Sequence, residues 1–145
     1  GAVYNEKMEV VHYGTNQKEE IKRFRGSKYV QSQIGNTYQE TKSLLLKGYL
    51  VCFSGTPCQI AGLKNFLRKE YTNLITVDLV CRGNPSPLLL KKYLAYQEKY
   101  YNSKITKVKF RDKYYGYDFS TMTLEFQRFN ITMEWKEIPC SNSFF

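Results

Sequence analysis

The chain has 145 residues, of which 42% are hydrophobic and 16% aromatic, and it carries a formal net charge of +9. This length is enough for one domain with a real core, and no apolar run is long enough to cross a membrane. No signal-peptide pattern is visible, and the four widely spaced cysteines do not resemble a secreted disulfide framework. We therefore expect a reduced, cytoplasmic protein.

The positive charge favours an acidic partner, such as a phosphate, an anionic cofactor, an acidic protein or nucleic acid. The positive charge is spread along the chain, with one basic group in 18–28 and another in 104–113, and 13 tyrosines and 9 phenylalanines supply rings that could stack on a ligand. Composition alone favours a simpler interpretation, which is a solvated basic surface around an aromatic core.

The first half of the chain predicts short strands alternating with helices. Thr15 is placed to cap the first helix, and Gly48 is placed to end the second. The predicted elements are a strand at 8–12, a helix at 17–23, a loop at 24–32, a helix at 36–47 and a strand at 49–53.

The second half begins in the same way and then changes period. The elements expected are a helix after Cys58, a strand at 74–80, a helix from Ser86-Pro87 to about Tyr100, and strands at 104–111, 119–126 and 131–135. Side chains alternate in 104–111, with Thr106 on the apolar side, and again in 119–126, which predicts a β-hairpin with one solvated face. The fold class is therefore α/β, a single domain over 1–145 with a mixed β-sheet, flanking helices and a C-terminal β-hairpin.

Two predicted strands each lead into a short loop with a cysteine. The strand at 49–53 is followed by Ser54-Gly55-Thr56-Pro57-Cys58, and the strand at 74–80 by Cys81-Arg82-Gly83-Asn84-Pro85. In a parallel sheet both loops leave the carboxyl edge, where open α/β folds keep their ligands. Cys58 and Cys81 are thus expected to share one site. The local alternative for each loop, an ordinary turn with a structural cysteine, stays open.

Other side chains give weaker signals. Two cysteines are too few for a closed zinc or iron–sulfur site, and the chain has no Cys-x-x-Cys and one histidine. Cys52 lies in an apolar strand and is expected in the core, and His12 is expected to be structural. The segments 25–29 and 111–113 combine cations with hydroxyl or aromatic groups suited to phosphate and ring recognition.

Four segments together resemble the C-terminal domain of the coenzyme F420 hydrogenase/dehydrogenase beta subunit. They are 24–32, 53–64, 77–87 and Phe110-Arg111-Asp112-Lys113 with Gly116, in the order of that family and over about residues 1–126. The resemblance implies an oxidoreductase that binds FAD and [4Fe-4S] clusters. It also implies electron relay between the clusters and a hydride carrier, which is F420 in archaeal members, with a ferredoxin-like domain or subunit as partner.

The resemblance also implies roles for individual residues. Cys58 and Cys81 become candidate cluster ligands. The candidate flavin-site groups are Ser27, Lys28 and Tyr29 with the backbone of Gly55 and Thr56, and the candidates for the anionic part of a cofactor are Arg111 and Lys113.

The chain departs from the family pattern in three places. Arg82 stands where the family usually has His, and Tyr117 where it often has Trp. Arg82 cannot exchange a proton as His can, which removes acid–base help there. The Cys-x-x-Cys of the family is not found, and segment 141–145 resembles the stretch before it, so we expect a fragment of a larger subunit that lacks its cluster. Cys140 has no assigned role.

Two alternatives remain beside the resemblance. One is a basic module that binds nucleic acid or an acidic protein, although nucleic acid is not the expected partner. The other is a thiol-dependent enzyme that uses Cys58.

Overall fold

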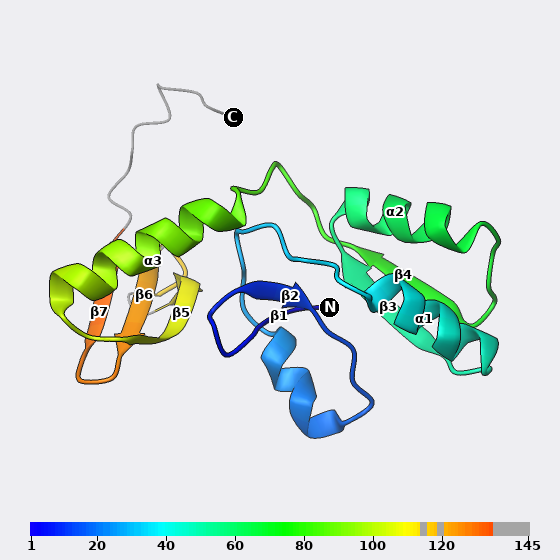
Figure 1. Cartoon of the computed structure of the whole chain (residues 1–145), viewed down its shortest axis with the longest axis horizontal. Helices are drawn as coiled ribbons and strands as arrows, with labels where there is room; N and C mark the ends of the chain where they lie inside the picture. Colours follow the sequence, from blue (N-terminus) through cyan, green and yellow to red (C-terminus); the bar gives the residue numbers. More distant parts are fainter. Residues whose placement is uncertain (114–115, 119–120, 135–145) are drawn as a thin grey trace.

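Three small β-sheets and three α-helices account for most of the residues that the structure describes, which are 1–113, 116–118 and 121–134 of a computed structural model (Figure 1). The strands are β1 (Ala2–Tyr4), β2 (Val10–His12), β3 (Val51–Gly55), β4 (Leu74–Asp78), β5 (Ile105–Asp112), β6 (Thr121–Phe126) and β7 (Asn130–Glu134). The helices are η1, a 3-10 helix (Lys18–Phe24), α1 (Thr37–Leu46), α2 (Pro57–Leu67) and α3 (Pro87–Tyr101). The predicted α/β class is confirmed, with the parallel and antiparallel strands distributed over separate sheets.

The middle of the chain forms a β3–α2–β4 unit. β3 and β4 pair in parallel, from Val51 opposite Leu74 to Gly55 opposite Asp78. Both α1 and α2 pack on the side of β3 that carries Phe53, and they contact each other. The buried cluster of this unit consists of Leu45, Phe53, Ile60, Leu63 and Leu67. The parallel pairing expected from the sequence is therefore confirmed.

The C-terminal unit is a three-stranded antiparallel sheet, β5–β6–β7, with α3 packed on it. The predicted hairpin is thus confirmed, although its residue pattern differs. A register shift between Ile105 and Lys107 buries Ile105 and leaves Thr106 exposed, so the prediction that Thr106 faces the core is wrong. Trp135, the predicted end of the last strand, lies outside the described residues.

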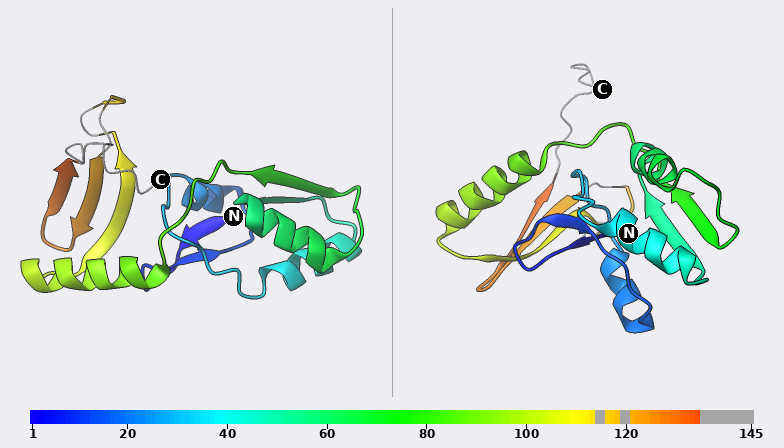
Figure 2. Two further views of the ribbon diagram at one scale, coloured as in Figure 1. Left: turned by 90° about the horizontal axis from the view of Figure 1, so that it is seen from above. Right: turned by 45° about the vertical axis from the view of Figure 1, so that its right-hand side comes forward.

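The N-terminal strands lie between these two units, as both views in Figure 2 show. β1 and β2 pair antiparallel, and Val11 of β2 forms a parallel bridge with Gln33. Val10 and Val30 belong to the buried cluster of the C-terminal unit. The N-terminal segment therefore joins the two units.

The starts of α2 and α3 follow capping signals in the sequence, whereas the predicted cap of the first helix by Thr15 is wrong, because Gln17 precedes η1 and no side chain caps it. The Ser86 hydroxyl accepts a hydrogen bond from the Leu88 amide at 3.2 Å, and Pro87 is the first residue of α3, as predicted. α2 begins at Pro57, because Thr56 and Gln59 form a capping box. Cys58 consequently lies inside the first turn of the helix, whereas the sequence placed the helix after it.

None of the helices in the described part of the chain is both long and apolar enough to span a membrane.

Candidate functional site

The two cysteine loops leave the same edge of the β3–β4 pair. The Leu79 amide donates to the Gly55 carbonyl at 2.9 Å, which extends the ladder one residue beyond β4. Cys58 follows Gly55 by three residues, and Cys81 follows Leu79 by two residues. Both thiols are exposed and free of disulfides. The structure thus confirms the edge that the sequence predicted.

The Cys58 turn is held by its own side chains. The Cys58 sulfur lies 3.1 Å from Thr56 Oγ1, and the Thr56 amide donates to Gln59 Oε1 at 3.1 Å. A β-carbon on Gly55 would lie only 3.2 Å from that same oxygen of Gln59, so the close approach favours glycine. The Thr56 amide, a candidate flavin-site group, is therefore engaged by Gln59 in this conformation.

The Cys81 loop directs two donors at the thiol. The Gly83 amide lies 3.4 Å and Asn84 Nδ2 lies 3.6 Å from the Cys81 sulfur. Gly83 has a φ of +130°, which L side chains rarely adopt, so glycine at this position allows the loop to fold back on the sulfur. Hydrogen bonds of this kind tune the sulfur ligands of metal clusters. The loop is anchored to the rest of the molecule by the Gln31 amide, which donates to the Pro85 carbonyl.

The candidate groups of the 25–29 loop have different environments. Lys28 Nζ donates to the carbonyls of Phe24, Arg25 and Gly26 at 3.2 to 3.4 Å, which caps the C-terminal end of η1. Partial burial lowers the pKa of Lys28. Ser27 is exposed and Tyr29 is half exposed. Lys28 thus has a structural role, while Ser27 and Tyr29 are available to a ligand.

Tyr29 brings the second group of candidate residues close to the first. Its ring lies edge-on to Phe110 of β5, with the ring centroids 5.8 Å apart. Arg111 follows Phe110 and is exposed. Lys113 Nζ lies 3.4 Å from the centroid of the Tyr117 ring. The hydrogen bond and the positive charge of Lys113 lower the pKa of Tyr117. Tyr29 is therefore in contact with the strand that carries Arg111.

Among the described residues, no helix covers one face of the β3–β4 pair. The exposed side chains on it are Cys52, Ile75, Val77 and Leu79, of which the last three are 50%, 42% and 53% exposed. The prediction that Cys52 lies in the core is wrong, because α1 and α2 both pack on the opposite face. Parallel sheets are normally covered on both faces, so this open face is unusual.

The sequence assigned no role to Ser32 or Gln59, and it gave His12 no partner. The structure places these three side chains in contact behind the Cys58 turn. Their contacts span sequence separations of 20 and 27 residues, which no local pattern reveals.

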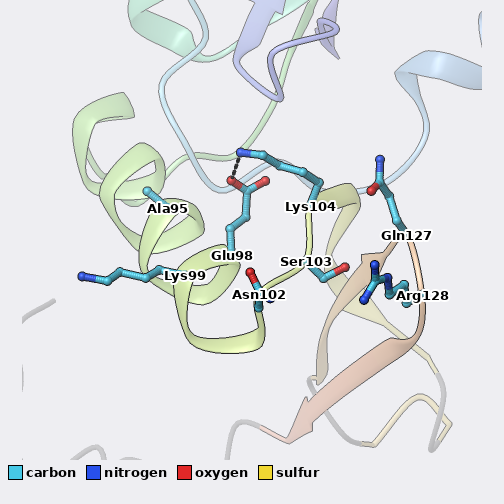
Figure 3. Close-up of a pocket in the computed structure, with 8 residues that line it drawn as sticks. All are labelled: Ala95, Glu98, Lys99, Asn102, Ser103, Lys104, Gln127 and Arg128. Atoms are coloured by element: carbon cyan, nitrogen blue, oxygen red, sulfur yellow. Dashed lines mark hydrogen bonds and ion pairs between the residues drawn. The ribbon is translucent and has the colours of Figure 1, made fainter.

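Two depressions lie beside α3, away from the cysteine loops. The first, about 480 Å³, is bounded by the end of α3 and the turn before β7, and Figure 3 shows the residues that line it. Its main contact ties a helix to a strand, since Glu98 pairs with Lys104 at 2.7 Å and accepts from the Ile105 amide at 3.0 Å. The second, about 720 Å³, runs between the start of α3 and β2. None of the candidate site residues lines either depression.

The described residues do not complete a metal site. No group of three or more His, Cys, Asp or Glu side chains lies together within 1–113, 116–118 and 121–134. Cys140 lies outside this part of the chain.

Comparison with known proteins identifies one family. A family model for the C terminus of the coenzyme F420 hydrogenase/dehydrogenase beta subunit matches residues 49–142, well over half of the chain. The match includes Cys58, Cys81, Arg111 and Lys113, and it begins after the 25–29 loop. No curated protein and no solved structure matches the chain. With its two cysteine loops inside the matched region, the chain belongs to the family defined by the C-terminal domain of coenzyme F420 hydrogenase/dehydrogenase beta subunits.

Proposed function

We propose that the chain is the flavin-binding domain of an iron–sulfur oxidoreductase that relays electrons between [4Fe-4S] clusters and a soluble hydride carrier such as F420. The observation that carries the proposal is the shared edge of β3 and β4, where two exposed thiols of the family-matched region emerge together. FAD is the expected flavin, and a ferredoxin-like domain or subunit is the expected electron partner.

The thiols fit part of the ligand set of a cluster. Iron–sulfur clusters are held by cysteine thiolates, usually four. Cys58 and Cys81 are exposed, free and at one edge, and Cys81 already accepts two hydrogen bonds. The described residues offer no third ligand beside them. Cys58 and Cys81 would therefore supply two of the ligands, with the others coming from outside the described residues.

The Tyr29 region fits the ring and the anionic part of a flavin cofactor. Tyr29 presents a half-exposed ring supported by Phe110, and Arg111, the next residue of β5, is exposed. Lys113, two residues after Arg111, lies over the Tyr117 ring. Ser27 is accessible in the same loop. In this assignment Lys28 shapes the loop rather than meeting the ligand, because its ammonium group is directed at three carbonyls.

A bound flavin supplies the exchange between one-electron and hydride chemistry, and the protein supplies position and electrostatics. Tyr29 would orient the ring, while Arg111 and Lys113 would hold the negative charge. The thiol-enzyme alternative is less well supported. The single histidine of the chain contacts Ser32 and Ser54, so it gives Cys58 no imidazole base.

The test is a titration of the chain with FAD, followed by flavin fluorescence. We expect saturable binding that Tyr29→Ala weakens about fivefold, since an aromatic contact contributes ~1 kcal/mol. Arg111→Ala is expected to weaken binding in a salt-dependent manner. Lys92→Ala, which removes an exposed cation on α3, is the matched control and leaves the affinity unchanged. Absence of FAD binding, or equal loss in the control, contradicts the proposal.

A further inference from the structure

The one histidine of the chain is buried behind the Cys58 turn. His12, at the end of β2, is 8% exposed and stacks on the Phe53 ring at 5.2 Å between centroids. Its Nδ1 lies 2.8 Å from Ser32 Oγ, and its Nε2 lies 3.1 Å from the Ser54 carbonyl oxygen. Both ring nitrogens therefore have a partner, and one partner belongs to the strand residue directly before Gly55.

The contacts continue from Ser32 back to the same turn. Gln59 Nε2 lies 2.9 Å from Ser32 Oγ, and Gln59 Oε1 accepts from the Thr56 amide. A chain of hydrogen bonds thus leaves the turn at the Ser54 carbonyl and returns to it at the Thr56 amide, two residues later. Only Gly55 separates the two ends.

For a neutral imidazole, the direction of every hydrogen bond in this series follows from its two ends. The Thr56 amide can only donate, so the Gln59 oxygen accepts and the Gln59 nitrogen donates to Ser32. The Ser32 hydroxyl accepts from Gln59 and has its hydrogen left for His12 Nδ1. Nδ1 is then the unprotonated nitrogen, and Nε2 carries the hydrogen that it donates to the Ser54 carbonyl, which can only accept. Of the two neutral tautomers, only the Nε2–H form satisfies all four bonds.

We infer that His12 and Ser32 are positioning residues of the β3–α2 turn, which they hold through this one-directional chain with His12 as its neutral Nε2–H tautomer. Cys58 follows this turn directly, next to Gln59, so its place at the sheet edge depends on groups from β2 and from the segment after Val30. The inference is independent of whether a cluster or a flavin is bound. Its test uses the cofactor-free chain.

The surroundings of His12 favour the neutral form. Burial lowers the pKa of His12, the Gly1 amine, whose own pKa is lowered to about 6 by burial, lowers it further, and the Ser54 carbonyl acts in the opposite direction. The other groups that face the residue are uncharged: the Phe53 ring from β3, the Ser32 hydroxyl, and the Thr37 hydroxyl of α1, which donates to the His12 carbonyl. Adding a proton at Nδ1 would set a donor against the Ser32 hydroxyl hydrogen.

The first test reads the tautomer directly. Because the chain has a single histidine, nitrogen–proton correlation spectra of ¹⁵N-histidine-labelled protein contain one imidazole. We expect the Nε2–H form at pH 7. The Nδ1–H form, or an imidazolium at this pH, overturns the inference.

The second test reverses the direction of the hydrogen bonds that Ser32 makes. In Gln59→Glu the carboxylate can only accept, so the Ser32 hydroxyl turns to it and Ser32 Oγ must accept from His12 Nδ1. His12 is then a donor at both nitrogens, and its titration midpoint should rise relative to the unmodified chain. Gln39→Glu, at an exposed position of α1, is the matched charge control and leaves the midpoint unchanged. An unchanged midpoint in Gln59→Glu contradicts the proposed direction.

The third test concerns the turn itself. Ser32→Ala interrupts the series of hydrogen bonds between His12 and Gln59. We expect the Thr56 amide hydrogen to exchange with solvent about fivefold faster, which is the effect of one lost hydrogen bond of ~1 kcal/mol. The Leu94 amide of α3 reports whether the rest of the fold is intact. Equal protection of Thr56 in Ser32→Ala and in the unmodified chain would show that Ser32 does not position the turn.

Discussion

At the residue scale, the contacts of two titratable side chains show structural roles that the sequence does not reveal. His12 and Lys28 both carry titratable groups that the fold uses internally, one against Ser54 and one against three carbonyls at the end of η1. Cys58 and Cys81, in contrast, remain exposed. Fewer residues are therefore available to a ligand than the candidate site residues predicted from the sequence.

The lowered pKa of His12 makes stability depend on pH. The unfolded chain takes up a proton near pH 6.5, whereas the folded chain takes it up only at lower pH. The contribution of His12 is thus complete above about pH 6.5 and is lost as the pH falls toward the folded pKa.

We expect the free energy of unfolding, measured by urea denaturation, to decrease as the pH drops from about 7 to 5. In His12→Asn the decrease over this interval should be smaller, because the remaining groups titrate equally in both proteins. Identical pH profiles of the two proteins would show that His12 is not held neutral by the fold.

At the element scale, α2 is the link between the core and the candidate site. Its buried face includes Leu63, which is fully buried, while its first turn carries Cys58. A helix anchored in this way fixes the thiol through packing as well as through hydrogen bonds.

Leu63→Ala is expected to lower the free energy of unfolding by about 2 to 5 kcal/mol, as large-to-small changes in cores do. Leu46→Ala on α1 removes the same side chain from a position that is 63% exposed, and it should change stability by less than about 0.5 kcal/mol. Chemical denaturation of both variants measures the difference. A loss below about 1 kcal/mol in Leu63→Ala would contradict the packing described for α2.

Much of the element order could be predicted from the sequence, since Ser86-Pro87 marks the start of α3 and alternation marks the C-terminal strands. The shared edge of β3 and β4 also follows from local patterns, because an apolar strand followed by a helix implies a parallel partner. The exposure of Cys52 could not be predicted, since an apolar strand does not reveal how many of its faces are covered. The hydrogen-bond partners of His12 could not be predicted either, because they come from segments 20 and 42 residues away.

At the scale of the whole molecule, two buried clusters are joined by the N-terminal strands. Val10 packs in the C-terminal cluster, and His12, two residues later, binds the end of β3 in the other unit. The Tyr29–Phe110 contact adds a second connection between the N-terminal loop and β5. The candidate flavin residues and the cysteine loops are thus fixed in one framework.

Part of the net positive charge is neutralised by ion pairs within the C-terminal unit. Lys107 and Lys109 pair with Glu125, and Lys104 pairs with Glu98. Such exposed pairs contribute little to stability, but they place carboxylates beside the lysines of the basic segment 104–113. Three of the lysines in this segment are therefore paired with carboxylates.

If Cys58 and Cys81 form one metal-binding edge, anaerobic reconstitution with iron and sulfide depends on both thiols. With an external monothiol supplied to complete the ligand set, we predict that the chain takes up iron with the visible absorption of iron–sulfide species, that Cys58→Ala and Cys81→Ala each remove most of it, and that Cys52→Ala, an exposed thiol of the same strand pair, keeps it. Failure of the unmodified chain to take up iron, or undiminished iron in the Cys58→Ala/Cys81→Ala double variant, would contradict the proposed metal-binding edge.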